Sequence, residues 1–463
     1  MTTPDPCAVL GRLWQDAGHD PAALADLALT GTEPVLPSSF AVGTAAQASI
    51  AAAALAAAEL WRHRGGRRQR VAVDMRAAAI EFRSERYLRV DGKPAPEGWD
   101  KIAGLYRCGD RWLRLHTNFP HHRDGVLRLL QCDYDRAAVA RALKDWSAEA
   151  FETAAAEAGL VVTAARSLAE WDAHAQGRAV ASLPALMIEK IGEAPPQPLP
   201  LAARPLDGVR VLDLTRVIAG PVCGRTLAAH GADVMLVTAA HLPAIAPLVI
   251  DSGRGKLSTR IDLRDASGRE TLTGLMRSAD VMVQGYRPGT IAARGFDPEA
   301  AARIRPGIVY VSLSAYGPLG PWASRRGFDS LVQTASGFNL AEADAFGSDE
   351  PKPLPVQALD HASGYLLAFG AMTALLRRAT VGGSWHVRVS LAQTAHWLRG
   401  LGRIDGTACP DLAFDDVGDR LERTPSGFGE LTVVRHAAVM PQTPPRWVRP
   451  SVPLGTDAPR WPG

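Results

Sequence analysis

The chain has 463 residues, of which 47% are hydrophobic, enough for two or three domains with conventional packed cores. It holds 51 Lys and Arg against 48 Asp and Glu, a net charge of +3 without a basic stripe, so nucleic acid is not an expected partner. The five cysteines form no CxxC pair and the first residues hold no apolar targeting core, which favours a reducing cytoplasm.

The first segment, residues 1–94, is predicted to be mainly helical. An Ala-rich helix near 44–64 leads through a Gly-Gly turn into a strand near 70–74. The apolar run of this helix contains Gln47 and Glu59 and falls short of the ~20 residues that a membrane span needs. We therefore expect a buried helix, and no membrane as a partner.

Residues 95–190 differ in character from the segment before them. Alternation at 112–116 predicts a strand, and helical spacing at 135–143 and 147–158 predicts two helices. A small α+β domain is expected here. A proline-rich linker follows at 191–204, because proline fixes the backbone angle φ and removes a hydrogen-bond donor.

The last segment, residues 205–463, carries the strongest pattern. Strands at 209–214 and 234–237 flank a short helix, which predicts a parallel pair with a right-handed crossover. Further strands at 281–283 and 308–312, each after a helical stretch, extend the sheet. The fold class is thus α/β, with a Rossmann-like open parallel sheet in the large domain. Ligands are expected at the carboxyl ends of its strands. Because no GxGxxG follows the first strand, a nicotinamide-dependent dehydrogenase is not indicated.

Two stretches of the chain repeat one pattern, an apolar helix, a Gly-Gly turn and a strand. We call residues 36–75 the front copy and residues 354–391 the rear copy. Their strands align with a separation of 316 residues, which places Thr44 opposite Asp360. Only the rear copy keeps an acid at the start of its helix, so it is the candidate active unit. An Asp at this position is also a favoured helix cap, and the two roles can coexist.

Several short motifs in the last segment resemble, in their order, the class III coenzyme A transferases of the CaiB/BaiF type. That family includes the formyl-CoA and carnitine-CoA transferases. The motifs are PLDGVRVLDL at 205–214, AGP at 219–221, GADV at 231–234, GRGKLS at 253–258, ADVMV at 279–283, RPG at 287–289 and GFD at 327–329. The front of the chain resembles, more weakly, the later half of the family. The order of parts thus resembles a fusion of two units, of which the front one has lost its nucleotide-binding half and the rear one its small domain.

The resemblance implies that the protein moves coenzyme A between an acyl-CoA thioester and a carboxylic acid, with Asp360 as the nucleophile in an aspartyl intermediate. CoA is then a substrate, and neither a tightly bound cofactor nor a metal is implied. Small residues allow close backbone approach to the CoA phosphates and cations neutralise them, although a solvated arginine is the alternative at each position. The family forms interlocked dimers, so a homodimer is expected. The residues expected to contact CoA are Val217, Ala219, Gly253, Arg254, Lys256, Gly285, Tyr286, Arg287 and Arg326.

Two other functions fit the same resemblance. Racemases of branched acyl-CoA esters share the fold, but they pair the aspartate with a histidine where this chain has Phe328, which cannot carry a proton. His361 adjoins Asp360, but adjacent helical residues point in different directions. A non-catalytic CoA-binding protein is the second alternative, because the front copy has already lost its acid at Thr44.

Overall fold

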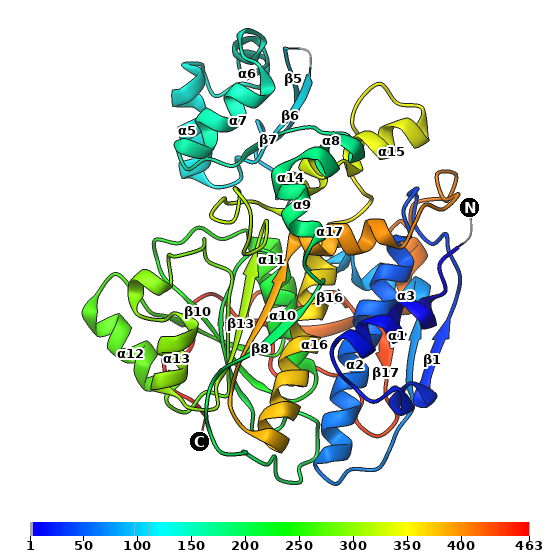
Figure 1. Cartoon of the computed structure of the whole chain (residues 1–463), viewed down its shortest axis with the longest axis vertical. Coiled ribbons are helices and arrows are strands. Elements are labelled where there is room, and N and C mark those ends of the chain that lie inside the picture. The colour runs from blue at the N-terminus through cyan, green and yellow to red at the C-terminus, as the bar shows by residue number, and fades with distance from the viewer. Residues whose placement is uncertain (1–2, 97, 110, 463) are drawn as a thin grey trace.

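The computed structural model describes residues 3–96, 98–109 and 111–462, arranged as a large lobe and a smaller one (Figure 1). The large lobe is built on a seven-stranded sheet whose strand order is β11-β10-β9-β12-β13-β14-β8. All neighbouring strands are parallel except β14 and β8, so the predicted α/β class with an open parallel sheet is confirmed. The strands are β8 (Met187–Gly192), β9 (Arg210–Leu214), β10 (Asp233–Thr238), β11 (Lys256–Arg260), β12 (Val281–Gln284), β13 (Val309–Ser314) and β14 (Ser384–Ser390).

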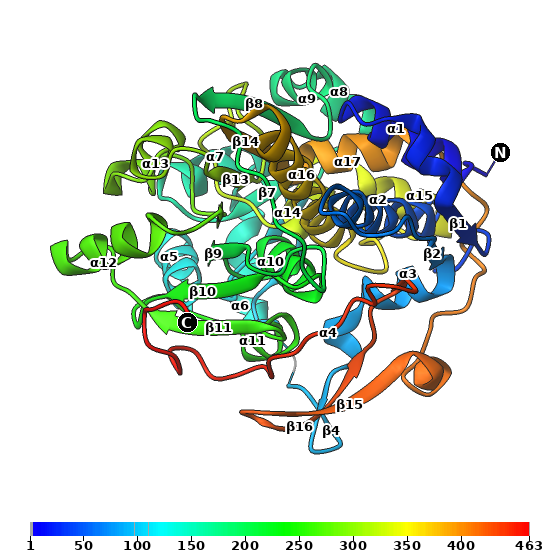
Figure 2. The same ribbon diagram turned by 90° about the horizontal axis from the view of Figure 1, so that it is seen from below.

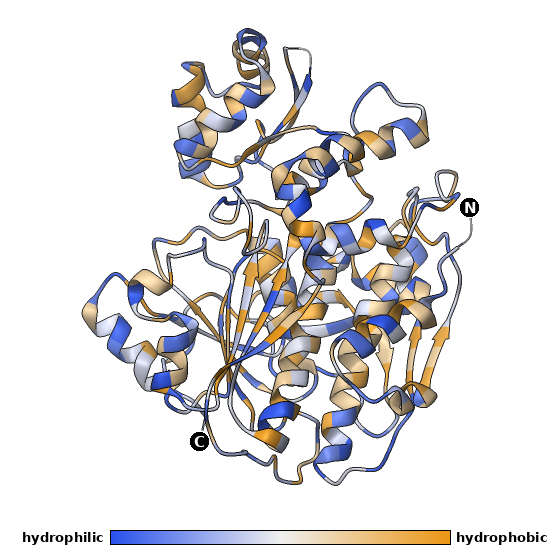
Figure 3. Ribbon diagram, in the orientation of Figure 1, coloured by the Kyte–Doolittle hydropathy of each residue, from blue (hydrophilic) through white to orange (hydrophobic). Residues whose placement is uncertain are grey.

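Helices cover both faces of this sheet. On one face α12 (Ala266–Met276) and α13 (Pro298–Ile304) close a core with Leu212, Met235 and Met282. On the other face lie α10 (Ala219–Ala229) and α16 (Ala358–Val381), whose residues belong to the main core. The inner strands are largely apolar, as parallel strands buried on both faces must be (Figure 3).

The repeat seen in the sequence is present in the structure. The helix α2 (Val42–His63) lies beside α16 in the interior (Figure 2), and the separation of 316 residues maps the first residue of one onto the first residue of the other. It also maps the start of α3 (Met75–Glu81) onto that of α17 (Leu391–Gly400). Beyond α2, the strands β1 (Leu27–Thr30), β2 (Val71–Asp74) and β17 (Ala438–Val439) form a separate three-stranded sheet.

By length and composition α2 could cross a membrane, but nearly all of its apolar stretch is buried inside the protein. Its neighbours in the core are α16, α1 (Pro6–Asp16) and α3. The side-chain NH2 group of Gln47 donates within the protein, to Thr30 O and Val73 O at 2.8 Å each. The prediction of a buried helix is confirmed.

The smaller lobe has its own core. Its antiparallel sheet consists of β5 (Gly104–Cys108), β6 (Arg111–Leu115) and β7 (Val162–Ala164), which pack with α5 (Pro120–Leu130), α6 (Arg136–Ala142) and α7 (Ala148–Glu157). The chain then returns through α8 (Leu168–Ala173) and α9 (Ala175–Ala181) to β8. Since β8 pairs with β14, the end of the predicted 95–190 domain belongs to the large sheet instead.

Strands of the C-terminal segment extend the two small sheets formed by the front of the chain. β15 (Leu421–Ser426) pairs with β16 (Gly429–Val434), which pairs with β3 (Arg89–Val90), while β17 joins β2. Residues beyond 440 run along the edge of the large sheet, where Asp457 accepts from the Ser258 amide at 2.7 Å. The predicted unit 205–463 therefore does not form a separate domain, because its last part packs against both the large sheet and the front of the chain. The remaining elements are α4 (Ser84–Tyr87), β4 (Lys93–Pro94), α11 (Ala246–Ser252), α14 (Asp329–Ala335) and α15 (Phe338–Phe346), with short 3-10 helices at Pro21–Asp26, Leu143–Asp145, Ala292–Arg294 and Asp415–Arg420.

Candidate active site

Asp360 lies in the first turn of α16, at the junction of two cavities of about 460 and 350 Å³. Its side chain lines both cavities although the residue is only 7% exposed. Val217 and Phe328 are the two other residues that line both. Asp360 therefore lies at the surface of both cavities while most of the residue is buried.

A second carboxylate caps the helix that carries Asp360. Asp329, the first residue of α14, accepts through Oδ2 from the amides of Leu359 and Asp360 at 2.8 and 2.9 Å. The amide of Gln333 donates to the other oxygen of Asp329. The capping role that the sequence allowed for Asp360 thus belongs to Asp329. Because these two backbone amides are already bonded, they are not available to a developing oxyanion.

The acidic surroundings of Asp360 set its protonation. Burial, the nearby charge of Asp329 and the charge of Glu85 together raise the pKa of Asp360 well above its usual range. Burial also raises the pKa of Asp329, but its three hydrogen-bond donors favour the charged form at that residue. Of the two carboxylates, Asp360 is therefore the more basic, and it is the stronger nucleophile once it ionises.

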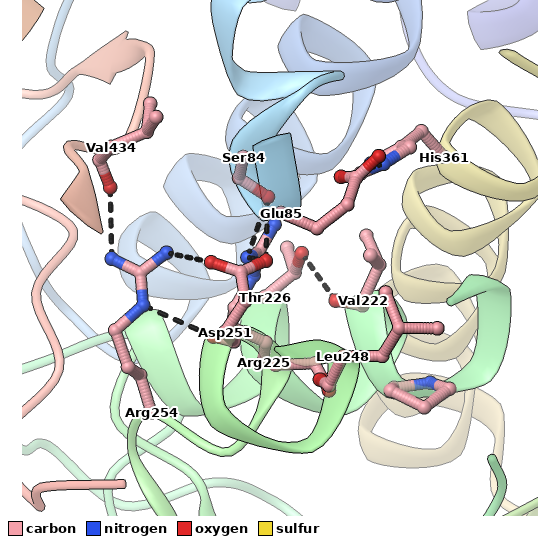
Figure 4. A network of polar contacts seen from close by, with 12 residues as sticks. Ser84, Glu85, Val222, Arg225, Thr226, Leu248, Asp251, Arg254, His361 and Val434 are labelled. Carbon is pink, nitrogen blue, oxygen red and sulfur yellow. Dashed lines mark hydrogen bonds and ion pairs between the residues drawn. The ribbon is translucent and has the colours of Figure 1, made fainter. Parts of the chain in front are cut away.

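Glu85 reaches this site from the front of the chain. It belongs to α4 and lines the smaller cavity, and its Oε2 accepts from His361 Nε2 at 3.1 Å. The ring of His361, drawn beside Glu85 in Figure 4, stacks on Phe82 with ring centroids 5.3 Å apart. His361 lines neither cavity, in agreement with the expectation that it points away from the reacting position.

Next to Glu85, a buried polar network joins three parts of the chain (Figure 4). Asp251 is bound by Arg225 at 2.6 Å, by Arg254 at 3.1 Å and by the Ser84 hydroxyl at 2.6 Å. Arg254 also donates to Val434 O at 2.8 Å. The guanidinium of Arg254 is therefore fully engaged in holding the C-terminal segment against the large lobe.

The loop at 253–256 lies outside both cavities, which corrects the expected position of three residues. Besides Arg254, Lys256 is 2% exposed and donates to Asp213 Oδ2 and Pro221 O at 2.8 Å each. A side chain at Gly253 would collide with Val249 O and Ser451, so this glycine serves close packing. All three act in the interior of the protein, and we leave them out of the proposed CoA site.

The larger cavity, which we call the cationic cavity, lies where an open parallel sheet binds ligands. The strand order places β9 beside β12, and the loops that follow these two strands form its walls. Its cations include six arginines, which suit the phosphates of a nucleotide. Of the residues expected to contact CoA, those that line it are Val217, Ala219, Gly285, Tyr286, Arg287 and Arg326.

Other residues of the cationic cavity were not foreseen. Arg216 follows β9 directly, so its position at a strand end was a usable signal. Arg325 directly precedes Arg326, an expected CoA contact, so its position in the sequence was an equally usable signal. His121 and His122 come from α5 of the smaller lobe, and nothing local in the sequence relates them to this sheet. The full set of additional basic residues is Arg216, Arg264, Arg294, Arg325, His121, His122 and His241.

The smaller cavity, which we call the apolar cavity, has mostly nonpolar walls from three regions. The front of the chain and the smaller lobe contribute one side, the loops after β9 and before α11 another, and α14 the third. His116 in its wall stacks on Phe328 at 3.9 Å, and burial lowers the pKa of His116 to about 3, so its ring is neutral. The nonpolar lining consists of Pro94, Ala95, Pro96, Trp99, Val217, Ile218, Ile245, Pro247, Leu248 and Phe328.

The structure thus combines an α/β sheet that has a cationic cavity at its switch point with a buried aspartate between that cavity and an apolar one. The family model described as "CoA-transferase family III" matches residues 14–197 and 206–402, and the chain belongs to this family.

The chain is similar to an acyl-CoA transferase of Gibberella moniliformis, at 29% identity over 69% of this chain and 63% of that protein. It is also similar to the probable fatty acyl-CoA transferase Rv3272 of Mycobacterium tuberculosis, at 35% identity over 42% of this chain and 52% of that protein. A crystal structure of Rv3272 covers 43% of this chain and 56% of its own, at 35% identity with a TM-score of 0.41. The chain thus spans less than two thirds of the length of either relative.

Proposed function

We propose that the protein is a CoA transferase that moves coenzyme A from an acyl-CoA thioester to a carboxylic acid, with Asp360 as the nucleophile. The position of Asp360 between the two cavities carries this proposal. The cationic cavity suits the phosphates of CoA, and the apolar cavity suits the acyl group. The thioester carbon that joins these two groups would then lie next to the carboxyl oxygens of Asp360.

The chemistry follows from that placement. An ionised oxygen of Asp360 attacks the thioester carbon, the carbon–sulfur bond breaks, and CoA leaves as a thiolate. The thiolate then attacks the aspartyl carbonyl of the mixed anhydride, which releases the donor acid and leaves an aspartyl-CoA thioester. The incoming carboxylate repeats these steps in reverse. Arg216 and Arg326, which line the cationic cavity, are candidates for holding the phosphates of the departing CoA.

The alternatives find less support. A racemase needs a second proton carrier opposite the aspartate, but Phe328 occupies that place and His361 is bonded to Glu85 outside the cavities. The neutral His116 lines the apolar cavity, but its low pKa makes it a weak base. A non-catalytic CoA-binding protein would have no use for a carboxyl group buried between the two halves of the ligand site.

The test is to trap the acylated enzyme. The purified protein is incubated with a panel of acyl-CoA thioesters and hydroxylamine, and its peptides are analysed by mass spectrometry. We expect a hydroxamate at Asp360. The exposed Asp349 of the same protein is the control and should carry none. Asp360→Ala should abolish transfer while CoA binding stays within about one order of magnitude. Unchanged transfer in that variant, or exchange of the acyl α-proton without CoA transfer, would refute the proposal.

The front of the chain supplies Glu85 and part of the apolar cavity to the same site, in the same chain. In the homodimer that the resemblance suggests, each chain would therefore carry its own complete active site.

A further inference from the structure

One residue at the junction of the cavities has an unusual backbone conformation. Val217, in the turn between β9 and α10, has a φ of +75°. A β-branched residue rarely adopts this left-handed region, because its side chain crowds the backbone there. Such a conformation persists only where the surroundings enforce it, and it often marks a functional position.

The surroundings of Val217 do enforce it. Before it in the chain, the amide of Thr215 donates to Asp213 Oδ1 at 3.0 Å, and Asp213 is held by the buried Lys256. After it, the chain enters α10 under equally tight packing, since a side chain at Gly364 of α16 would lie 2.6 Å from Ala219 O. The turn is therefore fixed on one side by a buried ion pair and on the other by the helix that carries Asp360.

The second wall of the junction is equally well held. Phe328 stacks on His116 with ring centroids 3.9 Å apart, and it meets Phe119 edge to face at 5.8 Å. Both partners belong to the smaller lobe. Val217 and Phe328 are thus two well-supported nonpolar side chains that, like Asp360, line both cavities.

We propose that Val217 and Phe328 form a narrow passage that selects acyl groups without a branch at the α-carbon. The inference rests on the proposed function, because it places the thioester carbon at Asp360. If CoA occupies the cationic cavity and the acyl chain the apolar one, the α-carbon must lie between these two side chains. A methyl group on that carbon would collide with a wall, whereas a methyl group further along the chain would lie in the wider apolar cavity.

The test compares three isomeric donors, hexanoyl-CoA, 4-methylpentanoyl-CoA and 2-methylpentanoyl-CoA, by CoA release in the presence of hydroxylamine. For the unaltered protein we expect kcat/KM to be at least tenfold lower for the 2-methyl isomer than for the other two. Val217→Ala and Val217→Gly should reduce that difference at least fivefold, and Val217→Ile should widen it. The exposed Val381, changed to Ala, serves as the matched control and should leave all three ratios unchanged.

The melting temperatures of the Val217 variants show whether a changed isomer ratio comes from the size of the side chain or from a destabilised turn. Glycine adopts a positive φ without a steric penalty, so Val217→Gly should unfold at no lower temperature than the unaltered protein. CoA release from none of the isomers would overturn the proposed function and this inference with it. Release with the same isomer ratios in the Gly, Ala, Val and Ile proteins would overturn this inference alone, as would efficient use of the 2-methyl isomer by the unaltered protein.

Discussion

The starts of α2 and α16 are equivalent positions of one repeat, yet only one of them is a site. At α16, Asp360 lines two cavities and Asp329 caps the helix. At α2, Thr44 is completely buried and its amide donates to Glu33 Oε1 at 2.6 Å. Each helix start has thus kept a capping carboxylate from another segment. The comparison shows that a helix start can keep its capping carboxylate without lining either cavity.

The difference lies in what faces each helix start. In front of α16 stand the loops after β9 and β12, which form the cationic cavity. The sheet beside α2 has only β1, β2 and β17, and it contains no counterparts of β9 or β12. A parallel sheet without a switch point offers no crevice for a ligand. The front copy therefore retains its packing role, while Thr44 at its helix start lines neither of the two cavities.

The strongest way to break the comparison is to exchange the two residues. Asp360→Asn should lower transfer by ~10⁴-fold or more, because the nucleophile is removed. Adding Thr44→Asp should restore nothing, since Thr44 is completely buried and lines neither of the two cavities. Thr44→Asp alone should cost about 3–5 kcal/mol, because it buries an unpaired charge beside Glu33. Chemical denaturation and the transfer assay test both points, and any activity regained by the double variant would contradict the comparison.

The two caps should differ in their effect on activity but not on stability. Asp329→Ala and Glu33→Ala each remove a cap and should each cost about 0.5–2 kcal/mol of unfolding free energy. Only Asp329→Ala should also impair transfer, because it alone alters the surroundings of Asp360. Denaturation curves measured together with kcat/KM check this. The prediction would be contradicted if the transfer activity of Glu33→Ala fell by more than its fraction of folded protein.

Stability should depend on pH at both helix starts. Burial raises the pKa of Asp360 strongly and that of Glu33 to a smaller extent. The folded protein then binds these protons more tightly than the unfolded chain does, so it loses stability as pH rises above about 4. Asp360→Asn and Glu33→Gln should therefore gain in melting temperature relative to the unaltered protein between pH 4 and pH 8, with the larger gain at Asp360. If melting temperature depended on pH in the same way in all three proteins, the pKa shifts would be contradicted.

The smallest expected effect concerns Glu85, which has no counterpart at the start of α2. Its charge contributes to the raised pKa of Asp360. Glu85→Gln keeps a partner for His361 but removes that charge, so the acid limb of the pH–rate profile should move to lower pH by less than about one unit. Glu193→Gln, at an exposed position, is the control. A shift to higher pH would show that Glu85 acts in another way.

Much of the fold followed from the sequence because the signals were local. The strands β9, β10, β12 and β13 are short apolar runs, and the repeat placed both α2 and α16 within two residues of their observed starts. The candidate nucleophile and the loop 285–287 also lie where the motifs predicted. These features depend only on periodicity and on the rule that ligands bind at strand ends.

The misplaced residues show what local patterns leave out. Arg254 and Lys256 sit in a Gly-rich loop, a composition that suits phosphate binding as well as an ion pair. Their partners, Asp251 and Asp213, decide between the two roles, and Asp213 lies 43 residues away in the chain. Glu85 reaches the site from the front of the chain in the same way. Such pairings arise only when distant segments pack together.

The covalent link between the two copies has one further consequence. In an assembly of separate subunits, the packing of α2 against α16 would be lost on dilution, but here both helices belong to one polypeptide. The buried polar network of Ser84, Asp251 and Arg254 also joins the front of the chain to the large lobe. The site should therefore stay assembled at nanomolar protein concentrations, where a reversible oligomer would have come apart.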